Sequence, residues 1–150
     1  MSLGSFFVPS NAVLRRIRRA EWLEQHGSVG RRAGHLVRYR LGESWGVFVN
    51  ASAQIGAVRF EHPTSVVIGA GAVVEDGVRI WQNVTIGADD VGGTAYPTIR
   101  RGARLFAGCC ILGGIVVGEG ATVGANSVVV RDVRPGAVVV GAPAREAGGR

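Results

Sequence analysis

The sequence contains no lysine, only two cysteines and five prolines, and no long uninterrupted hydrophobic run. Its aliphatic stretches near residues 128–130 and 138–140 are broken by charged residues and proline, which excludes a bilayer-spanning segment there. The first ten residues lack the charged start and apolar core of a secretory signal, so we expect a cytoplasmic protein. With 150 residues, 47% of them hydrophobic and 19% charged, the chain predicts one globular domain rather than a disordered chain.

The two cysteines and three histidines argue against a metal or redox centre. Cys109 and Cys110 are adjacent, a spacing that suits neither a structural disulfide, nor zinc ligands, nor a redox pair. His26 and His35 lie in the N-terminal third, and only His62 lies further along the chain. We therefore predict no metal.

The basic charge is concentrated at the N-terminus and consists entirely of arginine. All 17 basic residues are arginine, the net charge is +6, and residues 1–50 hold eight arginines against three glutamates. Nucleic-acid binding would need a recognition motif or interleaved aromatic side chains, and neither accompanies this charge. We predict that nucleic acid is not a partner.

Residues 1–47 are predicted to form an α-helical segment. Ser10 or Asn11 can cap a first helix that ends near Gly27, and a second helix begins at about Ser28 and ends at Gly42. The expected apolar positions are Val13, Leu14, Ile17 and Leu23 in the first helix and Leu36, Val37 and Leu41 in the second. The expected exposed basic positions are Arg15, Arg16, Arg18, Arg19, Arg31 and Arg32. Two interpretations stay open. The helices pack on the main body or a neighbouring subunit, or their arginines add weak attraction to an anionic membrane surface, at about 1 kcal/mol each.

From residue 48 onward the sequence repeats every six residues. One aliphatic residue recurs at this spacing: Ile68, Val74, Ile80, Ile86, Ile99, Leu105, Ile111, Val117, Val123 and Val129. A small or β-branched residue follows four positions later: Ala72, Val78, Val84, Ala103, Cys109, Ala121, Ser127 and Val133. Such a repeat predicts a parallel β-helix in which three hexads make one coil of about eighteen residues. The aliphatic side chains point inward and stack from coil to coil, because no coil buries its face alone.

Two breaks interrupt the repeat, and both carry polar residues. Ile55 to Ile68 and Ile86 to Ile99 each span 13 residues instead of twelve. The first break contains His62, and the second contains the polar segment 89–97. Insertions in a solenoid become loops, and loops commonly carry function.

Four segments carry a specific resemblance. Segment 62–69 reads HPTSVVIG, 80–87 reads IWQNVTIG, 96–99 reads YPTI and 141–145 reads GAPAR. Over about residues 36–146 the chain resembles the hexapeptide-repeat acyltransferases. Within them it is similar to serine O-acetyltransferases, and most of all to the acetyltransferases of exopolysaccharide and colanic acid clusters. The resemblance implies an all-β fold, a left-handed parallel β-helix domain over residues 48–150 behind the helical segment 1–47.

The implied activity is acetyl transfer from acetyl-CoA to a hydroxyl, with no metal. His62 aligns with the essential histidine of the family. A neutral imidazole can take the hydroxyl proton during attack on the thioester, which is worth roughly 10²–10⁴-fold in rate. Backbone N–H groups of the glycine-rich turns are the expected oxyanion donors.

The chain also departs from serine acetyltransferases. Phe48 stands where they carry an aspartate that pairs with the histidine, and Tyr96 stands at a second histidine position. These departures favour a saccharide hydroxyl in surface polysaccharide biosynthesis as the acceptor, with serine, for cysteine biosynthesis, as the alternative. Glu61 is expected to bind the acceptor, to tune His62 or to be a plain surface residue. Trp81 is expected to line the acceptor pocket or to pack between subunits, and Tyr96 is a further acceptor-binding candidate.

The resemblance also implies a homotrimer with acetyl-CoA in the groove between two β-helices. The matching cofactor positions are Gly87, Ala88, Ala107, Gly108, Ala125 and Asn126. Arg131 and Arg145 either pair with the CoA phosphates or are solvated. Oligomerisation is supported by more valines than one narrow coil can hold: Val123, Val129, Val138, Val139 and Val140.

Two other classes of protein compete with this interpretation. A β-helical carbonic anhydrase needs three histidine ligands, and two of the three histidines precede the repeats. A non-catalytic β-helix scaffold stays open because Phe48 replaces the aspartate.

Overall fold

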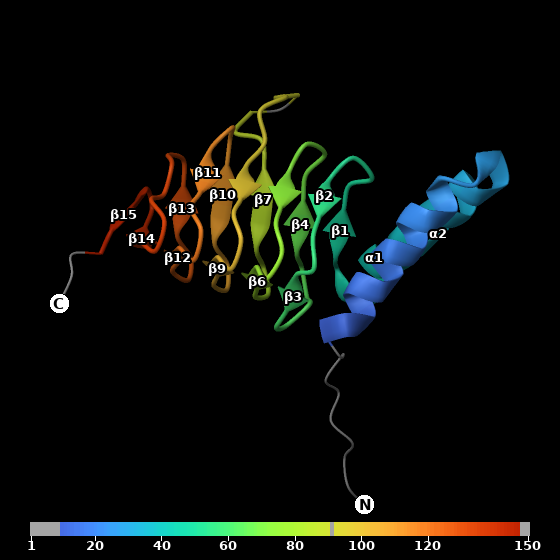
Figure 1. Cartoon of the computed structure of the whole chain (residues 1–150), viewed down its shortest axis with the longest axis horizontal. Helices are drawn as coiled ribbons and strands as arrows, with labels where there is room; N and C mark the ends of the chain where they lie inside the picture. The colour runs from blue at the N-terminus through green and yellow to red at the C-terminus, as the bar shows by residue number, and fades with distance from the viewer. Residues whose placement is uncertain (1–9, 91, 148–150) are drawn as a thin grey trace, which may run out of the picture.

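The computed structural model describes residues 10–90 and 92–147, which form two helices followed by short strands. The helices are α1 (Ser10–Glu24) and α2 (Gly27–Trp45), and they form a hairpin at one end of a stack of coils (Figure 1). The strands are β1 (Phe48–Val49), β2 (Gln54–Ile55), β3 (Arg59–Phe60), β4 (Val67–Ile68), β5 (Val73–Val74), β6 (Arg79–Ile80), β7 (Thr85–Gly87), β8 (Thr98–Ile99), β9 (Arg104–Leu105), β10 (Cys110–Leu112), β11 (Val116–Val117), β12 (Thr122–Val123), β13 (Val128–Val129), β14 (Val138–Gly141) and β15 (Ala144–Glu146).

The strands form three sheets that the chain visits in a fixed rotation. Sheet A has the order β1-β4-β7-β10-β13, sheet B β11-β8-β5-β2, and sheet C β15-β14-β12-β9-β6-β3. Each strand up to β13 pairs in parallel with the strand three places away, and only β15 pairs antiparallel, with β14. This connectivity is that of a three-sided parallel β-helix, as the repeat predicts. Its left hand and the domain boundary after residue 47 stay predictions.

The interior confirms the six-residue pattern. All ten aliphatic residues of the repeat are at most 2% exposed, and all eight small or β-branched positions are at most 5% exposed. In sheet A, Ile68 pairs with Ile86, Ile86 with Ile111, and Ile111 with Val129. Full burial of each such side chain contributes roughly 1.5–3 kcal/mol relative to exposure.

The first break in the repeat has a different form from the expected one. Phe60 is fully buried at the inward position of β3, five residues after Ile55 and eight before Ile68. The 13-residue gap therefore contains a strand that the strict period missed. The extra residues all lie between Phe60 and Ile68, in the loop that carries His62.

The second helix differs from the prediction in its end and in its buried face. It continues past Gly42 to Trp45 and ends at Gly46, whose φ of 64° is left-handed and whose N–H donates to the Gly42 carbonyl. Leu36 is 55% exposed, whereas Gly30 and Gly34 are buried. These two glycines face α1 so closely that an added Cβ would lie 2.3 Å and 2.8 Å from α1 backbone oxygens. Backbone proximity, rather than an apolar stripe, therefore forms the helix contact.

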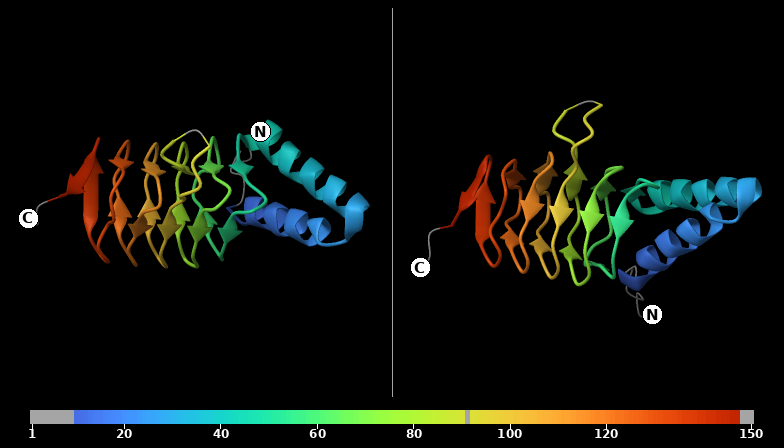
Figure 2. Two further views of the ribbon diagram at one scale, coloured as in Figure 1. Left: turned by 90° about the horizontal axis from the view of Figure 1, so that it is seen from above. Right: turned by 45° about the horizontal axis from the view of Figure 1, so that its top comes forward.

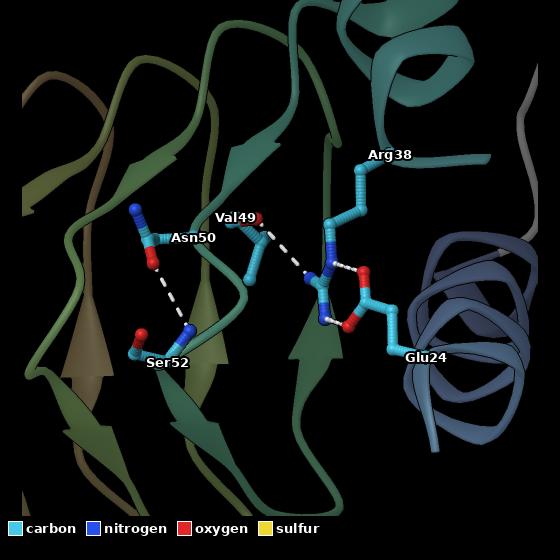
Figure 3. A network of polar contacts seen from close by, with 5 residues as sticks. All are labelled: Glu24, Arg38, Val49, Asn50 and Ser52. Atoms are coloured by element: carbon cyan, nitrogen blue, oxygen red, sulfur yellow. Dashed lines mark hydrogen bonds and ion pairs between the residues drawn. The ribbon is translucent and has the colours of Figure 1, made fainter. Parts of the chain in front are cut away.

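A partly buried ion pair links the helical hairpin to the first coil. The Arg38 guanidinium donates to both Glu24 carboxylate oxygens, at 2.8 Å and 3.1 Å, and to the Val49 carbonyl at 3.1 Å (Figure 3). In the next turn, the Asn50 side chain accepts from the Ser52 N–H. The arginine thus joins α1, α2 and β1.

The valines invoked for oligomerisation divide between the inside and the outside. Val123, Val129 and Val139 are buried in the coil, so the interior holds three of the five valines. Val138 and Val140 are 45% and 46% exposed. A coil interior holds one such side chain per strand because successive side chains of a strand point to opposite faces.

The second break forms a loop between β7 and β8 that projects from the coil stack (Figure 2).

Neither α1 nor α2, the helices of the described residues, has the length and apolarity that a bilayer crossing requires. The cytoplasmic location stays a prediction.

The Arg38 contact gives a stability prediction. Arg38→Ala leaves the part-buried Glu24 carboxylate without its partner, so we expect the free energy of unfolding to fall by about 2–3 kcal/mol. The control Arg32→Ala removes an exposed arginine of the same helix and is expected to change it by under about 0.5 kcal/mol. Urea unfolding measures both, and equal effects would contradict the anchoring role of Arg38.

Candidate active site

His62 lies in the loop that joins sheet C to sheet A, between β3 and β4. Pro63 and Val66 are buried and fill the interior, while the His62 side chain is exposed. The His62 carbonyl accepts from the Thr64 N–H at 2.8 Å, which tightens the turn. We call the stacked turns that lead from sheet C into sheet A the His62 corner: residues 61–66, 81–84, 106–109 and 124–127.

The His62 corner repeats one backbone conformation from coil to coil. Ser65, Asn83, Gly108 and Asn126 have left-handed φ values of 53°, 58°, 73° and 56°. Asparagine and glycine accept this conformation at low cost. An added Cβ on Gly108 would lie 2.2 Å from the Asn126 side-chain oxygen, so the corner is closely packed.

Four predicted cofactor positions lie on this same corner. Ala107, Gly108, Ala125 and Asn126 occupy the turns of the second and third coils beyond His62, and the Asn126 N–H donates to the Ala107 carbonyl at 2.9 Å. The fold therefore places His62 and a ladder of small-residue turns along one edge. Whether these turns bind a cofactor stays a prediction.

Three other predicted residues lie at the opposite end of sheet A. Gly87 is the last residue of β7 and Ala88 follows it, and because parallel strands share a direction, their corner lies across the sheet from His62. The Tyr96 ring covers Gly69 and Gly71, where an added Cβ would lie 2.6 Å from ring atoms in each case. Tyr96 thus packs the projecting loop onto the preceding coil. Within one chain the structure does not bring Tyr96 to His62.

The two arginines expected at the CoA phosphates are exposed and lie away from His62 itself. Arg131 follows β13 at the far end of sheet A. Arg145 lies in β15, where its guanidinium donates to the Ala144 carbonyl at 2.9 Å. These positions do not test whether Arg131 and Arg145 bind the CoA phosphates.

Phe48, at the position of the family aspartate, packs on the helical hairpin. It begins sheet A in register with Val67, and an added Cβ on Gly42 of α2 would lie 2.5 Å from its ring. The Phe48 side chain has no acceptor for an imidazole N–H. If His62 has an orienting acceptor, it comes from another residue.

Glu61, which the sequence predicts to bind the acceptor or to tune His62, forms ion pairs with two arginines. Its carboxylate accepts from Arg79 at 2.6 Å and pairs with Arg59 at 3.2 Å, and its side chain is 15% exposed. The carboxylate charge is therefore compensated on the outer face of sheet C. This arrangement is poorly suited to binding an ammonium group.

Trp81 lies beside Glu61 in an aromatic stack that the sequence reading missed. Its ring stacks on Phe106 with centroids 4.4 Å apart and planes at 17°, and the Arg79 guanidinium lies 4.9 Å from the Trp81 centroid. Nothing in the linear sequence marks Phe106 as a residue of the candidate site. Only the pairing of β6 with β9 shows that it is the neighbour of Trp81.

Gln82 follows Trp81 and carries an unsatisfied acceptor. Among the described residues its side-chain oxygen is buried without a hydrogen-bond donor. A buried acceptor in this state costs roughly 1–3 kcal/mol. Such atoms are rare in folded proteins.

Cys109 does not supply a nucleophile. Burial raises the pKa of the Cys109 thiol to about 12, so it stays protonated in the physiological range. No group of three or more His, Cys, Asp or Glu side chains within the described residues is arranged to hold a metal ion.

Comparison with known proteins gives a consistent answer. The serine acetyltransferase of Mycobacterium tuberculosis is 42% identical over 135 residues, 87% of this chain and 57% of the relative. That of Escherichia coli K12 is 37% identical over 137 residues, 90% of this chain and 50% of the relative. This chain is similar to serine acetyltransferases. No family model matches it.

Solved serine acetyltransferases share the fold. The Brucella abortus enzyme matches with a TM-score of 0.86 and 33% identity over 93% of this chain and 57% of that one. A serine acetyltransferase in complex with CoA matches with a TM-score of 0.83 and 31% identity over 95% and 58%. The chain spans about half the length of the curated serine acetyltransferases it matches, between 43% and 57% of the first three.

The Cys109 thiol gives a chemical prediction. In Cys110→Ser protein at pH 8, Cys109 should react with iodoacetamide at least about 100-fold more slowly than in denaturant, because the reactive thiolate is scarce below the raised pKa and the side chain is buried. Mass spectrometry measures the modification. Cys109→Ser is the matched control, since Cys110 is partly exposed and should react in the folded protein. Rapid labelling of Cys109 in the folded state would contradict its inward placement.

Proposed function

We propose that this chain is an acetyl-CoA-dependent O-acetyltransferase of the serine acetyltransferase type, with L-serine as the first acceptor to test. The observation that carries the proposal is the alignment of His62 with a ladder of small-residue turns along one edge of the coil stack. Similarity to serine acetyltransferases, including one solved with CoA, supports the donor. The left hand of the β-helix and the division into residues 1–47 and 48–150 belong to the same proposal.

The reaction assigns His62 the role of general base. Its neutral imidazole takes the proton of the acceptor hydroxyl while the oxygen attacks the thioester carbonyl. Backbone N–H groups of the glycine-rich turns stabilise the tetrahedral oxyanion. The carbon–sulfur bond then breaks, and the CoA thiolate leaves and takes the proton from the imidazolium.

A homotrimer would complete the site. The predicted residues lie at both ends of sheet A, with His62 at one and Gly87, Ala88 and Tyr96 at the other. In a closed threefold ring, one corner of a chain lies against a different corner of the next. The outer face of sheet A supports this, because Phe48 and Val67 on it, and Val130 directly after β13, are 56%, 40% and 45% exposed.

A saccharide hydroxyl is the second candidate acceptor. Two observations favour it: Phe48 replaces the aspartate, and Glu61 is neutralised by Arg59 and Arg79. Such an enzyme would act in surface polysaccharide biosynthesis. A non-catalytic scaffold is the remaining alternative, and loss of turnover on removal of His62 distinguishes an enzyme from it.

The N-terminal hairpin presents a second possible contact. Four large apolar side chains are exposed among its arginines: Trp22, Val29, Leu36 and Tyr39. Contact with a neighbouring subunit and weak contact with an anionic membrane surface are both compatible with this surface. Membrane association stays a prediction.

His62→Ala tests the proposed mechanism. Thiol release from acetyl-CoA with L-serine should lose about 10²–10⁴-fold in kcat, with the acetyl-CoA KM within about twofold, because only the base is removed. His35→Ala, an exposed histidine of α2, is the control and should keep full activity. The absence of serine-dependent release, in a protein that still binds acetyl-CoA, would favour a saccharide acceptor. Unchanged kcat in His62→Ala would exclude His62 as the base.

Val67→Arg tests the trimer. An arginine on the exposed face of sheet A should convert the trimer to monomers, because a buried unpaired charge at the interface costs several kcal/mol. Light scattering after size-exclusion chromatography measures the mass. Val138→Arg on sheet C is the control and should stay trimeric. A wild-type monomer would refute the proposed assembly.

A further inference from the structure

The outer face of sheet C carries three arginines in register. Arg59 pairs with Arg79 and Arg79 with Arg104, on β3, β6 and β9. Neighbouring strands lie about 4.8 Å apart, so three guanidinium side chains leave the sheet side by side. Like charges in such a column repel, and the arrangement costs stability unless anions neutralise it.

The chain itself supplies one carboxylate to this column. Glu61 pairs with Arg79 and Arg59, whereas Arg104 is exposed and forms no ion pair among the described residues. Each of the other ion pairs among the described residues joins one arginine to one glutamate, as in the pair of Arg100 with Glu75. The face of β3, β6 and β9 therefore keeps an excess of two positive charges.

An aromatic surface adjoins the arginine column. Trp81 directly follows β6, two residues after Arg79, and Phe106 directly follows β9, two residues after Arg104. Both rings are partly exposed and stack on each other. Arg79 is fixed from two sides, by the Glu61 carboxylate and by the Trp81 ring. A guanidinium held in this way is ready to bind an anion with little loss of side-chain entropy.

This surface leads directly to His62. Glu61 and Trp81 occupy equivalent positions on adjacent coils, since the Glu61 N–H donates to the Ile80 carbonyl that precedes Trp81. His62 is the next residue after Glu61. A molecule lying on Trp81 with its anionic group at Arg79 and Arg104 would therefore extend from the corner that carries the histidine.

We propose that the acceptor of the reaction carries a carboxylate or phosphate group, which binds Arg79 and Arg104 while the acceptor stacks on Trp81. This inference rests on the proposed function. The position of the charge favours the acceptor over the phosphates of CoA, because those phosphates lie a pantetheine arm away from the thioester. Further along the same face, β12 and β14 present Thr122 and Val138 instead of arginines.

Arg104→Gln tests the inference, because Arg104 is exposed and its loss breaks no ion pair of the described chain. Thiol release is measured with paired probes, each acid beside its neutral form: L-serine and L-serine methyl ester, D-glucuronate and D-glucose, and glucose 1-phosphate and D-glucose. For the acid that wild type accepts, Arg104→Gln should raise KM about ten- to hundredfold. KM for the neutral probe and for acetyl-CoA should stay within about twofold.

Two variants control for fold and for bulk charge. Arg104→Lys keeps the charge and should raise KM for the acid by less than the glutamine variant. Arg101→Gln removes an exposed arginine of the same coil at the corner between sheets B and C, and should leave KM unchanged. The serine and sugar-acid arms identify the source of the anionic group.

The outcomes separate this inference from the proposed function. Turnover that depends on His62 but not on Arg104 or on the acid group would overturn the inference and keep the enzyme. A raised acetyl-CoA KM in Arg104→Gln, with an unchanged acceptor KM, would also overturn it, in favour of the CoA phosphates. If no acceptor is turned over, calorimetry of the same acids decides. Arg104-dependent binding supports the anion site without the enzyme, and no binding overturns it.

Discussion

The structure depends on one constraint: each strand buries a single aliphatic side chain, and only the coils above and below it can cover that side chain. Ile68, Ile86 and Ile111 illustrate this, because each is shielded by its partners in sheet A. The end of the stack has no further coil, so another element must cover it. At the N-terminal end the helical hairpin does so, with Val13, Ile17 and Leu41 in the same core as the first coil. The Arg38–Glu24 pair then fixes the hairpin in place.

The interior could be predicted from the sequence because burial follows the period. Every aliphatic residue that recurs at six residues is buried. Phe60 was missed because it breaks the spacing, at five residues after Ile55, and period alone cannot locate a strand beside an insertion. The buried face of α2 was missed for a different reason. Gly30 and Gly34 have no side chain, so close helix contact leaves no hydrophobic signal.

The candidate site was only partly predictable, because spacing along the chain does not show which end of a sheet a residue occupies. His62 was found from the first break together with the resemblance of its segment. Tyr96 was grouped with it, yet the structure places Tyr96 against Gly69 and Gly71, across sheet A. Phe106, Arg79 and Arg104 were missed because their shared face arises from strand pairing between coils. Strand pairing brings these residues side by side, and their positions along the sequence do not show it.

Acceptor choice must come from the outward positions of the coils. A general base and backbone donors act on any hydroxyl, so His62 and the turns of its corner do not distinguish one acceptor from another. The inward positions are fixed by packing and are nearly uniform in chemistry. The outward positions are free of that constraint, and on the face of sheet C that leads to the His62 corner they hold Arg79, Arg104 and Trp81. A surface with two uncompensated positive charges and an aromatic face favours a molecule that carries a carboxylate or phosphate over one that lacks an anionic group. The Glu61 carboxylate already neutralises one of the three arginine charges on this face, so the other two positive charges are available to a ligand.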